Sequence, residues 1–122
     1  MHKHNRRSTG AGFELYARSY LERQGYIILY TNLHLSHEEI DIVAQDADGI
    51  IHLVEVRSKS VSGFGLAIES IGQAKKRSLL RSAALYMSRY GVSEERLSID
   101  LITFDRGATG YRLVWYPNID LS

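Results

Sequence analysis

The sequence contains no cysteine and only one proline among its 122 residues. The absence of cysteine excludes disulfide bonds, thiol catalysis and the usual cysteine-based zinc sites, and it gives no reason to expect an oxidising compartment. No apolar run approaches the roughly 20 residues that span a bilayer, and no hydrophobic segment follows the basic N-terminus. We therefore expect a cytoplasmic protein with no membrane partner.

An excess of charge of either sign is also missing, because the formal net charge is +1. The charges are nevertheless separated along the chain. Residues 37–55 hold six acidic side chains and no Lys or Arg, whereas residues 1–7 and 71–93 hold basic side chains and no acid. This separation fits an acidic metal site beside a phosphate-binding surface, although charged runs are also common on ordinary solvated helix faces.

The composition is that of a folded globular chain, with 44% hydrophobic and 24% charged residues. The length suits one compact domain. We expect residues 1–9 to form a basic, flexible N-terminal arm and residues 10–122 to form a single domain.

Hydrophobic periodicity predicts an α/β domain with the element order α-β-β-β-α-β-β. Helical spacing of apolar residues predicts one helix from a cap at Ser8 or Thr9 to Gln24, and a second over residues 66–90 with a buried stripe of Leu80, Ala83, Ala84 and Met87. Strands are predicted at residues 26–33, 39–44, 50–57, 97–104 and 111–116, with a loop at residues 58–65. This order is typical of a mixed sheet flanked by helices.

The turn between the second and third predicted strands determines which side chains share a face. An Asp-Gly pair there indicates a tight hairpin. A three-residue loop ending at a left-handed Gly49 would place Asp41 opposite Glu55 and Glu39 opposite Arg57. A two-residue loop would put Asp41 and Glu55 on different faces, and the sequence favours neither loop strongly.

In the first register, two carboxylates face each other across the hairpin. Directly opposed side chains have β-carbons about 4.5–5.5 Å apart, so Asp41 and Glu55 would need a counter-ion, or one of them would take up a proton. A divalent cation such as Mg²⁺ suits such oxygen ligands, and Arg57 and Lys59, two and four residues after Glu55, would meet a negatively charged substrate oxygen. The alternative is an exposed salt bridge between Glu55 and one of these bases.

These acids resemble the PD-(D/E)xK nuclease signature, in which Asp41 precedes Glu55-Val56-Arg57 across a hairpin and Glu14 lies on the preceding helix. More closely, the chain resembles the YraN-like family of predicted endonucleases, which belongs to the restriction-endonuclease-like superfamily and is distantly similar to archaeal Holliday-junction resolvases. The resemblance spans roughly residues 10–104, and its matching segments are residues 12–14, 17, 20–21, 25–26, 32, 39–44, 53–57, 64–65, 69, 75, 83 and 100–101.

The resemblance implies a restriction-endonuclease-like core and hydrolysis of phosphodiester bonds in DNA, with branched or damaged structures as candidate substrates. It implies that Asp41, Glu55 and Glu14 bind Mg²⁺, or Mn²⁺ in its place, and that Glu39 is an accessory acid. The base at position 57 would orient the attacking water or stabilise developing charge. Nucleases of this kind often pair to act on two strands, so a homodimer is compatible with the resemblance.

Two residues depart from the family pattern. Arg57 replaces the usual lysine, and Glu38 replaces the glycine that usually precedes the Glu-Ile-Asp segment. Arginine stays protonated and cannot act as a general base, and Lys59 could substitute only if the strand end bends inward. The alternative function is therefore a catalytically inactive nucleic-acid-binding or scaffold module on the same fold.

Basic and polar residues on the second helix are candidates for contacts to phosphates. With Lys59, these candidate nucleic-acid-binding residues are Gln73, Lys75, Lys76, Arg77 and Arg81. A solvated helix face explains the same pattern.

We expect structural roles for four of the tyrosines and for one further acid. For Tyr16, Tyr20, Tyr26 and Tyr30 we favour core packing over base stacking, because they lie in regular elements. Asp100, within an apolar strand, is expected to make a structural hydrogen bond.

Overall fold

The structure, a computed structural model, describes residues 3–59 and 71–122, with side chains from residue 12 onward. The described residues form one five-stranded sheet in the order β1-β2-β3-β4-β5. Its strands are β1 (Ile27–Leu35), β2 (Glu38–Gln45), β3 (Ile51–Lys59), β4 (Leu97–Gly107) and β5 (Gly110–Tyr116). Strands β3 and β4 are parallel and the other neighbours are antiparallel. The predicted α/β class, with a mixed sheet flanked by helices, is confirmed.

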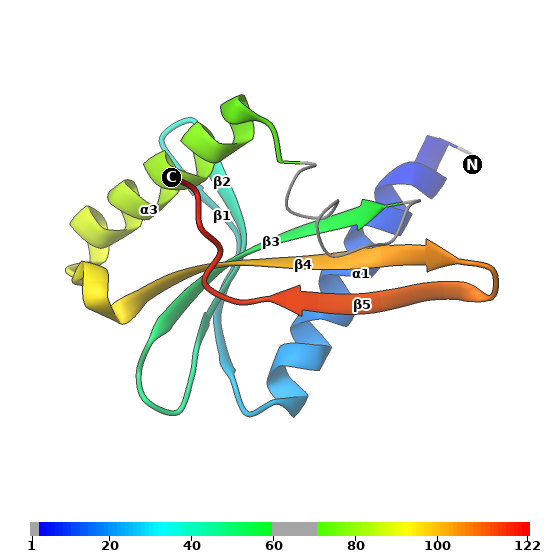
Figure 1. Cartoon of the computed structure of the whole chain (residues 1–122), viewed down its shortest axis with the longest axis horizontal. Coiled ribbons are helices and arrows are strands. Elements are labelled where there is room, and N and C mark those ends of the chain that lie inside the picture. Colours follow the sequence, from blue (N-terminus) through cyan, green and yellow to red (C-terminus); the bar gives the residue numbers. More distant parts are fainter. Residues whose placement is uncertain (1–2, 60–70) are drawn as a thin grey trace.

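Two long helices cover opposite faces of this sheet. Helix α1 (Lys3–Arg23) lies behind the sheet in Figure 1, and α3 (Gln73–Tyr90) lies toward the other side, beside the C-terminus. Val54 of β3 packs in the α1 cluster, whereas the adjacent Leu53 packs in the α3 cluster. Because successive strand residues point to opposite faces, the two helices bury the two sides of one sheet.

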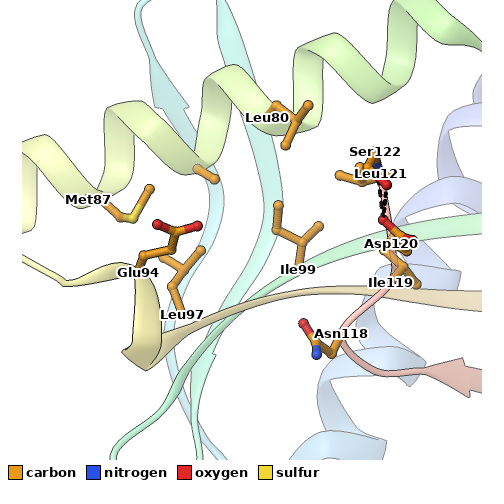
Figure 2. A pocket seen from close by; sticks show the side chains of 11 residues that line it. Leu80, Met87, Glu94, Leu97, Ile99, Asn118, Ile119, Asp120, Leu121 and Ser122 are labelled. Atoms are coloured by element: carbon orange, nitrogen blue, oxygen red, sulfur yellow. Dashed lines mark hydrogen bonds between the residues drawn. The ribbon is translucent and has the colours of Figure 1, made fainter.

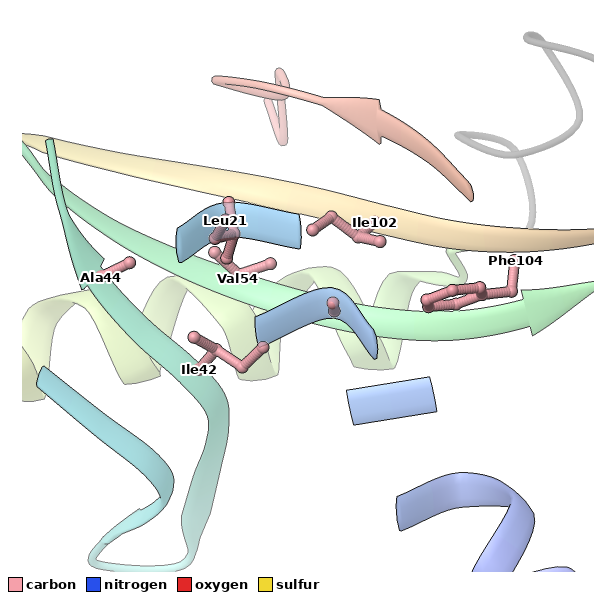
Figure 3. Packing of buried hydrophobic residues seen from close by; sticks show 7 residues of the cluster. Leu21, Ile42, Ala44, Val54, Ile102 and Phe104 are labelled. Atoms are coloured by element: carbon pink, nitrogen blue, oxygen red, sulfur yellow. The ribbon is translucent and has the colours of Figure 1, made fainter. Parts of the chain in front are cut away.

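The core beneath α1 is built from small and branched side chains. Ala17 and Leu21 of α1 are fully buried against Ile42, Val54 and Ile102 of the three central strands (Figure 3). Burial of a leucine side chain stabilises the fold by about 1.5–3 kcal/mol, so this contact fixes the position of α1 on the sheet.

The core beneath α3 differs from the predicted stripe. The buried residues of the helix are Leu79, Ser82, Ala83 and Tyr86. Leu80 is 48% exposed and Ala84 is also exposed, so the prediction of these two as core was wrong, whereas Ala83 was correct. Two adjacent leucines allow two stripes with the same spacing, and the sheet selects the one that continues to Tyr86.

The ends of several elements also differ from the prediction. Helix α1 begins at Lys3 and not at a cap at Ser8 or Thr9. Helix α3 begins at Gln73, after an extended Gly72 with φ −75° and ψ 173°. Strand β3 continues to Lys59, so the loop does not begin at residue 58. The rest of the predicted loop and the first five residues of the predicted second helix lie outside the described residues.

Within residues 3–59 and 71–122, no helix combines the length and apolar character needed to cross a membrane.

Candidate functional site

The β2–β3 hairpin adopts the three-residue loop that the sequence left open. The Asp46 N–H donates to the Ile50 carbonyl at 3.0 Å, and Gly49 has φ +86°. In the ladder Ile42 is the partner of Val54. This register directs Asp41 toward Glu55, the arrangement in which the two carboxylates interact.

Asp41 lies where the β2–β3 ladder ends. Its side chain takes the place of a backbone partner, because its Oδ2 accepts a hydrogen bond of 2.9 Å from the Val56 N–H. The next backbone pair along the hairpin is Ile42 with Val54. The carboxylate is therefore held against β3, next to the position of Glu55.

Glu55 is buried and forms an ion pair with a lysine of helix α3. Only 7% of the residue is exposed, and its Oε2 lies 3.0 Å from the Lys75 Nζ of α3. Glu55, Lys75, Arg57 and Ser58 line an open cleft of about 480 Å³. The cleft thus combines one buried acid with two basic side chains.

The electrostatics of Asp41 reflect its surroundings. The pKa of Asp41 is raised to about 7, first by burial and then by the neighbouring charge of Glu55, with a smaller contribution from Glu14. The hydrogen bond from Val56 and the charge of Lys75 act in the opposite direction. Burial and the neighbouring acids disfavour the charged form of Asp41, and a cation bound beside it would favour that form.

Glu14 and Glu39 are linked through an asparagine that the sequence analysis did not identify as functional. The Asn32 amide donates to the Glu14 Oε1 at 3.0 Å and to the Glu39 Oε2 at 3.1 Å. Asn32 lies in β1 and has φ +50°, in the left-handed region. Asn32 is one of the positions that carry the family resemblance, which could have marked it as a functional candidate. Its contacts with both acids depend on the pairing of β1 with β2, which the sequence alone does not give.

Glu39 does not lie opposite Arg57, so that part of the prediction was wrong. Its carboxylate contacts Asn32 and lies 3.9 Å from the His34 imidazole on β1. The alternation of β2 breaks at Asp41, because Ile40 packs in the α3 cluster while Ile42 packs in the α1 cluster. The β2–β3 ladder ends at Ile42, so Glu39 lies beyond the residues that pair with β3.

The described residues contain no group of three or more His, Asp or Glu side chains placed to hold a metal ion. Asp41 and Glu55 remain as a pair of carboxylates, coupled to Glu14 through charge. A hard divalent cation such as Mg²⁺ is commonly held by one or two carboxylates, with water and substrate phosphate completing its shell. The donor set of Asp41 and Glu55 fits such an ion.

The candidate nucleic-acid-binding residues divide into two groups. Lys75 is paired with Glu55, and the Arg81 Nε lies 2.8 Å from the Glu38 Oε2. Glu38 also accepts a hydrogen bond from the Ser78 hydroxyl, so the residue that replaces the family glycine anchors α3 to β2. The other candidates are the exposed Gln73 and Arg77 and the half-buried Lys76 and Lys59.

A second polar cluster lies within the sheet, away from the cleft. The His52 Nδ1 is 2.7 Å from the Asp100 Oδ2, and its Nε2 is 2.9 Å from the Asp46 Oδ2. Asp100 is fully buried and also accepts hydrogen bonds from Ser98, Trp115 and the backbone of residue 118. The structural hydrogen bond predicted for Asp100 is confirmed, whereas the partnership with His52 was not predicted.

A separate cavity of about 590 Å³ lies between α3 and the C-terminal segment (Figure 2). Leu80 and Met87 line it from α3, Ile99 from β4, and Ile119 from the segment after β5. Neither Asp41 nor Glu55 reaches this cavity, so it is not part of the carboxylate site.

Two solved structures are similar to the chain. One is a chain of the EndoMS-dsDNA2 complex, with 15% identity and a TM-score of 0.40 over 62% of this chain and 26% of that one. The other is SfsA of Pyrococcus furiosus in complex with Ca²⁺, with 15% identity and a TM-score of 0.42 over 89% of this chain and 62% of that one. The chain thus spans only part of either protein.

Two sequence relatives match along nearly their whole length. A UPF0102 protein of Dehalococcoides mccartyi is 38% identical over 94% of each chain. A UPF0102 protein of Haemophilus influenzae is 36% identical over 93% of this chain and 94% of its own. The model of the uncharacterised protein family UPF0102 matches residues 13–104. The chain therefore belongs to the uncharacterised protein family UPF0102, in agreement with the predicted YraN-like resemblance.

Proposed function

We propose that this protein is a Mg²⁺-dependent endonuclease that hydrolyses phosphodiester bonds in DNA, with branched or damaged structures as the substrates to test first. The observation that carries the proposal is the cleft in which the buried Glu55 lies beside Lys75 and Arg57, with Asp41 held at the end of the adjacent ladder. One acid for a metal and two bases for a phosphate line this open cleft, and the second acid, Asp41, interacts with Glu55.

Asp41 and Glu55 are the residues that would hold the ion, and Glu14 is the nearby acid coupled to them by charge. When bound, Mg²⁺ supplies a water of lowered pKa and neutralises charge on the scissile phosphate. Asp41, with a pKa of about 7, is partly protonated at neutral pH. Its deprotonated form is the ligand, so metal affinity increases as the pH rises through 7.

Lys75 and Arg57 supply positive charge to the substrate in this proposal. Both line the cleft, and each can donate hydrogen bonds to phosphate oxygens on which negative charge develops. Arginine remains protonated throughout, whereas a lysine amine can also release a proton. Lys75 therefore takes the role that the resemblance assigned to the lysine that is absent at position 57.

A cleavage assay tests the proposal. Wild-type protein is incubated with four-way junction, flap and duplex DNA in Mg²⁺ or Mn²⁺, beside Glu55→Gln and, as a matched control, the exposed Glu22→Gln. We expect cleavage by wild type and Glu22→Gln, and a loss of about 10²-fold or more in Glu55→Gln. Cleavage that survives Glu55→Gln would contradict the assignment of the site.

A second candidate function is a catalytically inactive nucleic-acid-binding module, and the arginine at position 57 favours it. An inactive module binds DNA in a salt-dependent manner without a metal. If wild type binds without cleaving and Arg57→Lys gains cleavage, the native site has lost activity through this replacement. Cleavage by wild type that Arg57→Lys leaves unchanged would contradict this second function.

A further inference from the structure

A hollow lined by aromatic side chains lies on the α1 side of the sheet, apart from the acidic cleft. Its volume is about 440 Å³, within the range of small-molecule sites. Helix α1 and strands β4 and β5 contribute its principal lining residues, which are Phe13, Tyr16, Tyr20, Arg23, Phe104 and Tyr111.

Stacked rings form the apolar part of this hollow. The Phe13 ring stacks on Phe104, with centroids 4.8 Å apart and planes at 27°, and meets the Tyr111 ring edge-on at 4.9 Å. Tyr16 and Tyr111 also line the hollow, yet they are 67% and 50% exposed. The core packing predicted for Tyr16 is therefore wrong, and two aromatic faces with polar edges are available to a ligand.

The charge around the hollow is positive. Arg23 lines it, and Arg106 is the ladder partner of Tyr111 and lies on the same sheet face as Phe104 by strand alternation. None of the lining residues, all of which belong to the described part of the chain, is acidic. An apolar peptide would make no use of these arginines, whereas a planar ring attached to a phosphate uses both features.

We infer that the hollow binds the base of an unpaired nucleotide, with its backbone phosphate next to Arg23 or Arg106. Aromatic side chains stack on any unpaired base, whereas the faces of paired bases are covered by their neighbours in the duplex. The inference rests on the proposed function to the extent that the nucleotide belongs to the substrate DNA. It names the substrate class, which is DNA containing a single-stranded or extrahelical nucleotide.

Helix α1 connects this hollow with the acidic site. The Phe13 ring packs on Phe104 of β4, whereas the adjacent Glu14 reaches Asn32 of β1. The two side chains therefore leave the helix in different directions, toward opposite edges of the sheet. Base binding and metal binding then depend on separate residues and can be tested separately.

The test measures the binding of a short single-stranded DNA with 2-aminopurine at one position, in EDTA so that no cleavage occurs. Stacking on aromatic rings quenches 2-aminopurine, and fluorescence anisotropy of an end label gives the affinity. We expect Tyr16→Ala and Tyr111→Ala to bind roughly 5- to 100-fold more weakly and to lose quenching. Tyr16→Phe keeps the ring and is expected to bind as wild type, and Leu80→Ala, exposed on the α3 side, is the surface control.

Several results would overturn the inference. One is that the wild-type protein does not bind the single strand. Another is that Tyr16→Ala and Tyr111→Ala bind it as tightly as wild type does. A third is that wild type binds fully paired duplex with the same affinity as the single strand. A change in sedimentation of these variants without a change in DNA binding would assign the hollow to self-association instead. Tyr16-dependent binding by a protein that never cleaves DNA would support this inference while contradicting the nuclease proposal.

Discussion

The ammonium nitrogen of Lys75 on α3 lies 3.0 Å from the Oε2 of Glu55 on β3. This ion pair joins the basic helix to the acidic strand, two features that are separate in the sequence. Because Glu55 is buried, removal of this partner would leave an uncompensated charge inside the protein. The pair places a lysine in the cleft, where position 57 supplies an arginine.

Replacement of Lys75 tests this placement. We expect Lys75→Ala to reduce DNA cleavage by about 10²-fold or more, because a charged donor beside the scissile phosphate is lost. Lys76→Ala, one residue along the same helix, is expected to change only salt-dependent binding, with the salt slope reduced by about 1 if it contacts a phosphate. Equal effects of the two substitutions would show that Lys75 acts only as part of the basic surface.

The coupling of Asp41 to Glu55 predicts a pKa change that needs no DNA. The charge of Glu55 raises the pKa of Asp41, so Glu55→Gln should lower it from about 7 toward the ordinary value. Lys75→Ala should raise it, because the charge of Lys75 lowers it in the native protein. Carboxyl carbon NMR titration measures both shifts, and Asp48→Asn at an exposed turn is the control. An Asp41 pKa that is unchanged in Glu55→Gln would mean that the two acids do not interact.

The His52 cluster predicts how stability depends on pH. Burial alone would lower the pKa of His52, but hydrogen bonds to Asp100 and Asp46 outweigh it and the pKa is raised. Burial likewise opposes the shifts of Asp100 and Asp46, whose pKa values are nevertheless lowered by hydrogen bonds that include those from His52. Tyr26 and Trp115 pack edge-on against the imidazole.

The sign of each shift sets the pH window. The contribution of His52 is fully present below its unfolded pKa of about 6.5 and is lost as the pH rises through the raised folded value. The contribution of the two acids is present above about 4 and is lost as the pH falls through their lowered folded values. Stability from the cluster should therefore be greatest between about pH 4 and 6.5, as measured by urea unfolding across pH.

Asp100→Asn removes the buried charge from the same cluster. We expect it to lower the free energy of unfolding by about 3 kcal/mol at pH 6, because the imidazolium loses one of its two carboxylates. The loss should shrink as the pH rises above the folded pKa of His52. A loss that is the same at pH 6 and pH 9 would contradict a charged His52.

The docking of α1 predicts a contrast between two leucines of one helix. Leu21 is fully buried, whereas Leu15 is 53% exposed. Leu21→Ala should lower the free energy of unfolding by about 2–5 kcal/mol through lost burial and a cavity. Leu15→Ala should change it by less than about 0.5 kcal/mol. Urea denaturation compares them, and similar losses would contradict the observed orientation of α1.

Much of the fold could be predicted from the sequence, because hydrophobic periodicity sets the type and order of elements. The element order was correct, and Gly49 was placed in the left-handed conformation in one of the two registers considered. The choice between those registers could not be made, since it depends on whether Asp46 or its neighbour closes the turn. The stripe of α3 was misplaced at Leu80 because adjacent leucines give equal periodicity, and only the sheet distinguishes them.

The candidate site was predictable only in part, for the same kind of reason. Asp41 and Glu55 were identified from strand alternation together with the family resemblance. The contact of Glu39 with Asn32 was not predictable, because it depends on the pairing of β1 with β2 and on the left-handed backbone of Asn32. The ion pair of Lys75 depends on where α3 crosses β3, and no local pattern in the sequence carries that information.

We propose that Asp41 and Glu55 together bind a divalent cation. Titration with Mn²⁺, followed by electron paramagnetic resonance of the free ion, tests it without DNA. Removal of an outer-shell partner commonly weakens metal binding by 10–100-fold, so loss of a direct ligand in Glu55→Gln or Asp41→Asn should weaken it by at least ~10-fold. Glu22→Gln should bind Mn²⁺ as tightly as wild type does. Equal Mn²⁺ affinity in wild type, Glu55→Gln and Asp41→Asn would contradict this proposal.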